Sequence, residues 1–191
     1  MATHTLEQRL LTVDEYHAMA RAGILTEDDR VELIDGKIIV MSPIGPPHIR
    51  CVIQLDRLLN RRIDQHDATD LFISVQNPVR LDIHGEPEPD VVLLRLPEGP
   101  LGTPRPEDVL LLIEVADTSL AHDRDIKLPR YARAGIPEAW IVALDEDHIE
   151  VYRRPQAQGY AERQVFQRSE AFEIEALPTL GAFSVDAILG T

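Results

Sequence analysis

A long apolar segment that contains one carboxylate constrains this chain more than any other feature. The segment reads LLLIEVADTS, in which the bulky apolar run 110–113 precedes Glu114, and Val115 and Ala116 follow it. A continuous apolar run of this kind predicts a strand that is buried on both faces of a sheet. A carboxylate in such a strand carries a high desolvation cost unless a partner compensates it. We therefore expect Glu114 to have a specific partner and a specific function.

The length and cysteine content favour one domain in a reducing compartment. A chain of 191 residues suits one domain with a sizeable core, and we expect a core at about 30–153, an N-terminal helical segment at 1–29 and a β extension at 154–191. The single cysteine, Cys51, excludes an intrachain disulfide. The first twenty residues lack the basic start and apolar stretch of a signal peptide, and no apolar run approaches the length of a membrane span. We therefore expect a cytoplasmic protein with no membrane partner.

The net charge of the chain limits the classes of function. A formal net charge of −14 weighs against a protein that simply coats nucleic acid, because neutralising phosphates requires Lys and Arg. The charge is compatible with an enzyme that meets DNA over a small basic patch, and divalent cations can bridge clustered carboxylates. A Ser or Cys hydrolase is not indicated, since the sequence has no nucleophile-elbow motif.

The patterns along the chain predict an α+β fold with a central mixed sheet flanked by helices. Thr12 and Glu15 form a capping-box pattern before a short helix that ends at Gly23, and Asp35-Gly36 predicts a hairpin between two short strands. Further elements follow in the order helix 46–66, a strand-like segment 71–81 with a turn or bend at Asn77-Pro78, strands 90–96 and 109–116, helix 123–135, strand 138–144 and an antiparallel β extension at the C-terminal end. The apolar side of the helix 46–66 is expected to contain Ile49, Val52, Ile53, Leu59 and Ile63.

Two carboxylates and a lysine are expected to meet at one edge of this sheet. Asp90 begins one strand and Glu114 lies near the end of the next, so antiparallel pairing would bring the two side chains together. The following helix returns across the sheet and carries Lys127. Mg²⁺ prefers oxygen ligands and retains several waters, so Asp90, Glu114 and the carbonyl of Val115 form a candidate magnesium site. Lys127 would stabilise the attacking hydroxide or the developing phosphate charge.

Four blocks of the sequence resemble a known family. VELIDGKIIVMSPIGPPH, EPEPDVVLLR, LLLIEVADTS and DRDIKLPRYARAGIPEAWIVAL together resemble the Uma-type restriction endonucleases of the PD-(D/E)XK nuclease superfamily, over roughly residues 12–153. The resemblance implies a restriction-endonuclease-like α/β core and phosphodiester cleavage of nucleic acid, DNA above all, with Mg²⁺ or Mn²⁺. It matches Pro89-Asp90 to the superfamily's PD and Glu114 to its (D/E).

One position departs from the superfamily pattern. The superfamily's lysine would fall two residues after the glutamate, where this chain has Ala116. The family resemblance places the lysine in the following helix, which here means Lys127. Pro129 follows two residues later and lacks a backbone donor, so the helix must either begin close by or bend there.

Each assignment has a structural alternative. Asp90 could simply begin its strand after Pro89, and Lys127 could be a surface lysine on a helix. The resemblance of the VELIDG block to the family suggests that Glu32 supports the metal or a water molecule. Glu32 could equally be an exposed carboxylate beside the hairpin turn. Glu114 is harder to dismiss, because carboxylates in apolar settings usually have a specific role.

The other notable side chains favour structural roles. His48 could contact a phosphate or cap its helix, with a structural role preferred. Gln76 fits a bend better than a site-lining role. Core positions are favoured for Tyr131, Trp140 and Cys51.

Two hypotheses of different classes therefore remain open. The first is a Mg²⁺-dependent endonuclease, for which a homodimer is expected because cutting both strands of a duplex needs two sites. The second is a catalytically silent member of the same fold that acts as a binding or assembly module. The Asp90, Glu114 and Lys127 set favours the first hypothesis, whereas Ala116 and the net charge favour the second.

Overall fold

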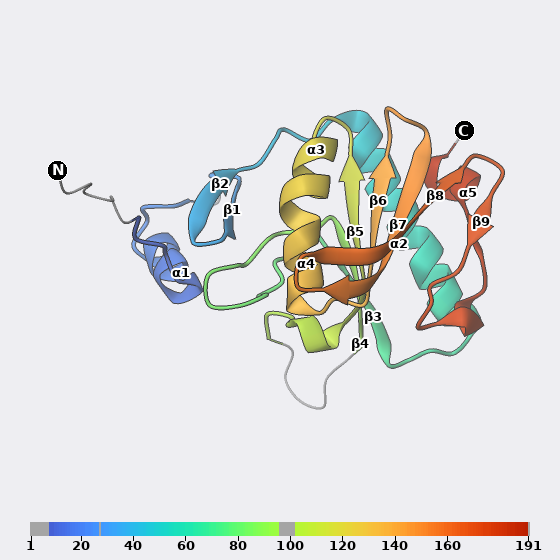
Figure 1. The fold of residues 1–191 in the computed structure, drawn as a ribbon, viewed down its shortest axis with the longest axis horizontal. Coiled ribbons are helices and arrows are strands. Elements are labelled where there is room, and N and C mark those ends of the chain that lie inside the picture. The colour runs from blue at the N-terminus through green and yellow to red at the C-terminus, as the bar shows by residue number, and fades with distance from the viewer. Residues whose placement is uncertain (1–7, 27, 96–101, 191) are drawn as a thin grey trace.

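A six-stranded mixed sheet forms the centre of the molecule (Figure 1). The computed structural model describes residues 8–26, 28–95 and 102–190. The strand order is β3-β4-β5-β6-β7-β8, with β5 and β6 parallel and all other neighbours antiparallel. The strands are β3 (Leu71–Val75), β4 (Val91–Arg95), β5 (Val109–Ala116), β6 (Glu138–Ala143), β7 (His148–Gln156) and β8 (Gly159–Gln167). The predicted α+β fold with a central mixed sheet is confirmed. Part of the Pro- and Gly-rich linker between β4 and β5, residues 96–101, lies outside the described residues.

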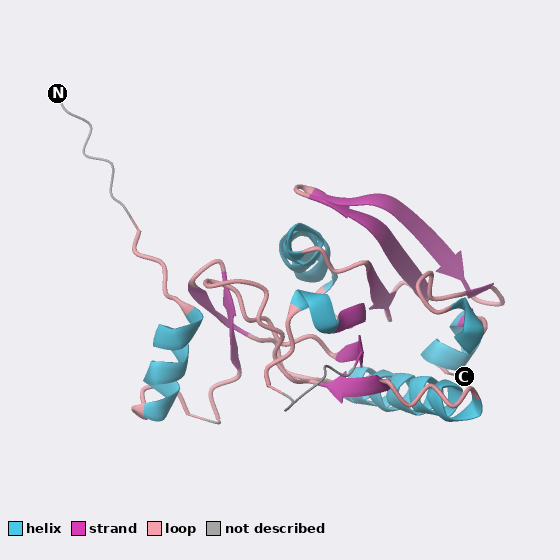
Figure 2. Cartoon of the chain, turned by 90° about the horizontal axis from the view of Figure 1, so that it is seen from below, coloured by secondary structure: helices cyan, strands magenta, loops and turns pink. Residues whose placement is uncertain are grey.

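Helices cover both faces of this sheet (Figure 2). The amphipathic helix α2 (Pro46–Gln65) packs on one face and buries Leu55 and Leu59, while α4 (Leu128–Ala134) covers the other face. The predicted apolar side of α2 was partly wrong, because Ile49 is 49% exposed and Ile53 is 47% exposed. Residues spaced three and four apart share one helix face, and the face that meets the sheet carries His48, Cys51, Val52, Leu55, Leu59 and Ile63.

A small N-terminal unit lies beside the sheet (Figure 1). It contains α1 (Val13–Arg21), whose predicted capping box between Thr12 and Glu15 is present, and the antiparallel hairpin of β1 (Val31–Ile34) and β2 (Lys37–Val40). Asp35 and Gly36 form the turn with φ of 47° and 70°, as a type I′ hairpin requires. An antiparallel bridge between Leu33 and Glu86 joins the hairpin to the loop that precedes β4.

The expected helix 123–135 is built from successive parts. A short turn, α3 (Leu120–His122), leads into the π-helical segment η2 (Asp123–Lys127), which continues into α4. Pro129 lies in the first turn of α4, where its missing N–H needs no partner. The change in helix type therefore accommodates the proline, and α4 ends at Gly135 with a left-handed φ of 87°.

The C-terminal part is mostly antiparallel, as expected, but it also contains helices. The β7–β8 hairpin belongs to the main sheet, and β9 (Ala171–Phe172) pairs with β10 (Phe183–Ser184). A short helix, α5 (Val185–Leu189), packs against α2. Single 3₁₀ turns occur at η1 (Pro106–Asp108) and η3 (Pro178–Leu180). No helix among the described residues is long and apolar enough to cross a membrane.

Candidate active site

The register of β4 and β5 brings Asp90 and Glu114 together. Val91 pairs with Ile113, so one step further along the antiparallel ladder places Asp90 opposite Glu114. The amide of Val115 donates a hydrogen bond of 2.8 Å to Oδ2 of Asp90. Both carboxylates and Val115 line one cleft of about 240 Å³. The predicted convergence of the two strand ends is therefore present.

Asp90 is held from two further directions. Nε2 of His48, in the first turn of α2, lies 2.9 Å from Oδ1 of Asp90. Nδ1 of the same ring is enclosed and has no hydrogen-bond partner among the described residues. The amide of Gln76 donates to the carbonyl of Asp90 at 3.0 Å, and Gln76 has a φ of 50°, which fits the predicted bend. Asp90 is thus more than a residue that begins a strand.

Glu114 is enclosed and has two partners on one oxygen. Its side chain is 3% exposed, and its Oε1 accepts a hydrogen bond of 2.5 Å from the Tyr131 hydroxyl and lies 3.2 Å from Nζ of Lys127. Oε2 accepts no hydrogen bond from any residue that the structure describes. Burial raises the pKa of Glu114 well above its usual value, against the opposing effect of Lys127. The partner expected for a carboxylate in this strand is therefore Lys127, with Tyr131 beside it.

Lys127 points into the cleft and is not a surface residue. The residue is 5% exposed, and its ammonium lies 3.1 Å from Oε2 of Glu32 and 3.2 Å from Oε1 of Glu114. Burial alone would lower the pKa of Lys127, but the carboxylates of Glu114, Glu32 and Asp123 outweigh burial and raise this pKa. The expectation that Lys127 reaches the carboxylates is thus met through Glu114 and Glu32.

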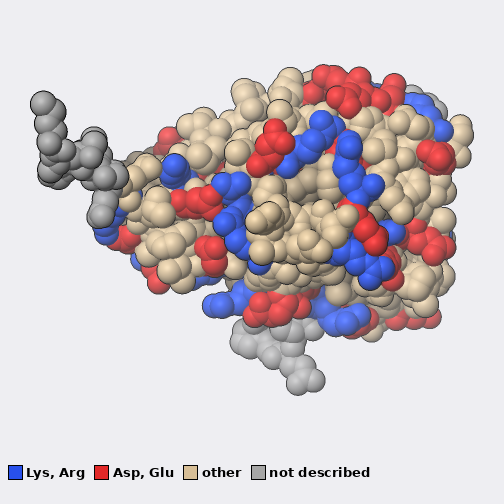
Figure 3. All heavy atoms as spheres, in the orientation of Figure 1, with Lys and Arg blue, Asp and Glu red and all other residues tan. Residues whose placement is uncertain are grey.

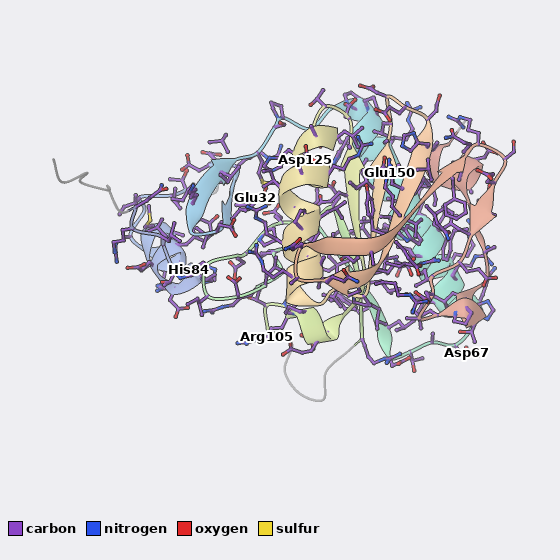
Figure 4. The ribbon with its side chains drawn as sticks, viewed as in Figure 1. Glu32, Asp67, His84, Arg105, Asp125 and Glu150 are labelled. Carbon is purple, nitrogen blue, oxygen red and sulfur yellow. The ribbon has the colours of Figure 1, made fainter. Side chains whose placement is uncertain are left out.

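Glu32 is a buried residue of the site, not an exposed hairpin carboxylate. It is 3% exposed, because the loop that precedes β4 runs along β1 through the Leu33–Glu86 bridge. The amide of Glu88 in this loop donates to Oε2 of Glu32 at 3.1 Å. Figure 4 shows Glu32 at the side of the helical layer that faces the N-terminal unit. The hairpin therefore contributes one carboxylate to the cleft from outside the main sheet.

Several residues of the site were not identified from the sequence. Asp123 is 3% exposed, accepts a hydrogen bond of 2.6 Å from Ser119 and lines the cleft. Its spacing of four residues before Lys127 would have placed both on one helix face. The hydroxyl contact of Tyr131 and the ring contact of His48 depend on residues distant in sequence, so no local pattern indicates them. Trp140 and Cys51 are buried in the core as predicted.

The donor set fits an ion that binds few protein ligands. Among the described residues, no three His, Cys, Asp or Glu side chains are grouped so as to hold one metal ion. Mg²⁺ typically binds one or two protein carboxylates and keeps several of its waters. Asp90 and Glu114 provide two adjacent carboxylates, and Oε2 of Glu114 accepts no hydrogen bond from the residues that the structure describes. A histidine- or cysteine-rich zinc site does not fit this arrangement.

A mixed sheet with paired carboxylates at adjacent strand ends, and a lysine that reaches them from the following helical segment, defines a nuclease-like α+β protein. The chain belongs to the Uma2 family, described as "Putative restriction endonuclease", whose model matches residues 13–186. A solved structure, titled "Crystal structure of a putative nuclease belonging to DUF820 from Anabaena variabilis ATCC 29413", shares the fold with a TM-score of 0.72 and 16% identity, over 94% of this chain and 97% of that chain. No curated protein matches this chain.

Proposed function

We propose that the protein is a metal-dependent nuclease that hydrolyses phosphodiester bonds in DNA. The observation that carries the proposal is the convergence of Asp90, Glu114 and Lys127 in one cleft, from a strand start, a strand end and a helix. Membership of a restriction endonuclease family supports the same reaction class. Each of the three side chains has the chemistry that phosphodiester hydrolysis requires.

The two carboxylates are proposed as the metal ligands. Asp90 and Glu114 would hold Mg²⁺ or Mn²⁺, with the carbonyl of Val115 as a further ligand. When bound, the metal supplies Lewis-acid stabilisation of phosphate oxygens and lowers the pKa of a coordinated water. Hydrogen bonds from the Val115 amide and the Tyr131 hydroxyl orient the two carboxylates before any ligand arrives.

Lys127 is proposed to stabilise the charge that develops on the phosphate. Its ammonium remains protonated beside Glu32 and Glu114, which hold it within the cleft. Glu32 therefore acts on Lys127 and not on the reacting atoms. A fixed ammonium in a partly enclosed cleft requires little reorganisation during the reaction, which is the main source of electrostatic catalysis.

One observation supports the silent binding module as a second candidate. The ammonium of Lys127 already contacts two carboxylates, and Ala116 occupies the superfamily's lysine position. A lysine neutralised in this way gives less stabilisation to a phosphate than a free ammonium would. The two candidates make opposite predictions for a cleavage assay.

The test is cleavage of supercoiled plasmid and of labelled duplex, single-stranded DNA and RNA in Mg²⁺, Mn²⁺ or EDTA. The nuclease hypothesis predicts metal-dependent cleavage by the wild type and loss of cleavage in Glu114→Gln. Asp70→Asn, a change on a side chain that is 62% exposed, is the control and should cleave normally. Inactivity of the wild type on every substrate in both metals would favour the silent module.

The working form is proposed to be a cytoplasmic homodimer, because cleavage of both strands of a duplex needs two sites. Light scattering of the wild type in the presence and absence of duplex would measure this state. A monomer under both conditions would contradict the dimer.

A further inference from the structure

A buried carboxylate outside the cleft holds two arginines side by side. Glu150 on β7 is fully buried, and it accepts hydrogen bonds from Arg124 and Arg163. Nε of Arg124 lies 3.1 Å from Oε2 of Glu150, and Nη2 of Arg163 lies 2.6 Å from its Oε1. Tyr152 and His148 donate to the same carboxylate. The two arginines come from the π-helical segment η2 and from the edge strand β8.

This cluster presents its positive charge to solvent. The side chain of Glu150 has no exposure, whereas that of Arg124 is 33% exposed and that of Arg163 is 48% exposed. Two guanidinium groups share one enclosed carboxylate, and they reach the surface while that carboxylate does not. Arginine has five N–H donors, and only some of them point at Glu150. The remaining donors are available to a ligand.

The cluster also lies on the side of the sheet that carries the cleft. Glu114 is paired in register with Ile141, and Ile141 with Glu150, so the two carboxylates lie on the same face two strands apart. Two strand spacings correspond to about 10 Å. Lys and Arg side chains gather along an arc over this face (Figure 3), and Glu150 lies beside the helical segment that carries Asp125 (Figure 4).

We propose that Arg124 and Arg163 form a clamp for a backbone phosphate of the nucleic-acid substrate, a few nucleotides from the scissile bond. The proposal rests on the proposed nuclease function for its substrate. A guanidinium pair matches the geometry of phosphate oxygens, and its fixation by Glu150 lowers the entropy cost of binding. The rise along the DNA axis is about 3.4 Å per nucleotide, so a contact about 10 Å from the cleft lies within a few nucleotides of the scissile bond. The clamp provides positive charge at the surface of a chain whose net charge is −14.

One exposed carboxylate competes with the clamp. Glu146 is 51% exposed and lies 3.8 Å from Nη2 of Arg124. A phosphate that binds the arginines would approach this carboxylate and be repelled by it. Removal of the Glu146 charge should therefore strengthen DNA binding, whereas removal of a clamp arginine should weaken it.

The test measures binding of a fluorescent DNA duplex by anisotropy, with Ca²⁺ in place of Mg²⁺, over a range of salt concentrations. Arg163→Gln should weaken binding about tenfold, the effect of losing one charged hydrogen-bond donor. It should also lower the slope of log K against log salt by about 0.9, the value for one phosphate contact. Arg163→Lys keeps the charge and should keep the slope while losing part of the affinity. Glu146→Gln should bind more tightly than the wild type.

Arg95→Gln is the matched control, because it removes the same charge from a side chain that is 55% exposed at the far end of the sheet. Its binding and salt slope should equal those of the wild type, and urea unfolding of every variant confirms that each is folded. An Arg163→Gln variant that binds like Arg95→Gln, or a wild type that binds no nucleic acid, overturns the clamp.

Cleavage in Mg²⁺ separates this proposal from the nuclease proposal. If the wild type cleaves and Arg163→Gln binds and cleaves equally well, the clamp is wrong and the nuclease assignment stands. If the wild type binds DNA with the predicted slope change but never cleaves, the clamp stands and the nuclease assignment is wrong. If both hold, Arg163→Gln should raise KM with kcat nearly unchanged, as expected for a contact that is equal in ground and transition states.

Discussion

Replacing Lys127 with methionine removes the ammonium that lies between two buried carboxylates. Glu32 and Glu114 are each 3% exposed and lie 3.1 and 3.2 Å from this ammonium. Loss of one partner from a buried ion pair typically costs 3–5 kcal/mol, because the remaining charge is neither solvated nor paired. We therefore expect Lys127→Met to lower the free energy of unfolding by about 4 kcal/mol.

A double-mutant cycle separates the ion pair from simple loss of packing. Glu32→Gln alone leaves Lys127 paired with Glu114, so we expect it to cost about 2 kcal/mol. In the double variant the Glu32 carboxylate is also absent, so the methionine leaves one fewer buried carboxylate without a partner than it does in the single variant. The double variant should therefore lose about 2 kcal/mol less free energy of unfolding than the two single variants lose together. This difference is the coupling energy, and its size is within the range for contacting residues.

Urea denaturation in EDTA, followed by circular dichroism, measures the cycle. The slope of the free energy against urea should be the same for all four proteins, since none changes the surface exposed on unfolding. The exposed pair of Arg95 and Asp70, 55% and 62% exposed, is the control and should show a coupling below about 1 kcal/mol. Additivity within about 0.5 kcal/mol for Lys127 and Glu32 would refute the ion-pair account.

Further predictions concern rate, pH and packing. Lys127→Ala should lower the cleavage rate about a hundredfold with metal affinity nearly intact in calorimetry, and an unchanged rate would reject the lysine assignment. Burial alone would raise the pKa of Glu150, but hydrogen bonds from Arg163, Arg124, Tyr152 and His148 lower it from 4.5 to about 2. The ionised Glu150 contributes up to about 3 kcal/mol to the free energy of unfolding above pH 4.5, and this contribution is lost as the pH falls toward 2. Glu150→Gln should therefore reduce the fall in the free energy of unfolding between pH 4.5 and 2, measured by urea titration at each pH. An unchanged fall would contradict the hydrogen-bonded account. On α2, Leu59→Ala should cost about 3 kcal/mol and Ile53→Ala under about 1 kcal/mol in the same assay, and equal costs would contradict the observed helix face.

The parts of the site that were predictable depend on strand order and register. Asp35-Gly36 has the sequence of a two-residue hairpin turn, and the turn forms as expected. The antiparallel meeting of Asp90 and Glu114 followed from a strand start and a strand end in consecutive strands. Local sequence sufficed in both cases because the deciding geometry is a turn type or a ladder direction.

The remaining features depend on contacts that no local pattern encodes. The burial of Glu32 arises from a loop more than fifty residues later in the chain, through the Leu33–Glu86 bridge and the Glu88 amide. Periodicity placed Ile49 and Ile53 on the apolar side of α2, because both are hydrophobic, although the sheet contacts the neighbouring face.

The helix before Pro129 shows a second limit. Sequence rules required either a bend or a start near this proline, and the structure satisfies them with the π-helical segment η2. The altered helix type changes the spacing of side chains around the helix axis, so the contact of Arg124 with Glu150 could not be derived from a regular helical spacing.

The most direct test of the central claim is a crystal structure with Mn²⁺, located by its anomalous scattering. The proposed nuclease predicts a single peak in the cleft that is bonded to one side-chain oxygen of Asp90 and one of Glu114, at the short distances of an oxygen-ligated site, about 2.1 Å for Mg²⁺. Lys127 should remain beside the ion without binding it. A cleft without a peak at saturating Mn²⁺, or an ion bound to neither Asp90 nor Glu114, would contradict the assignment of these carboxylates as the metal ligands of a nuclease.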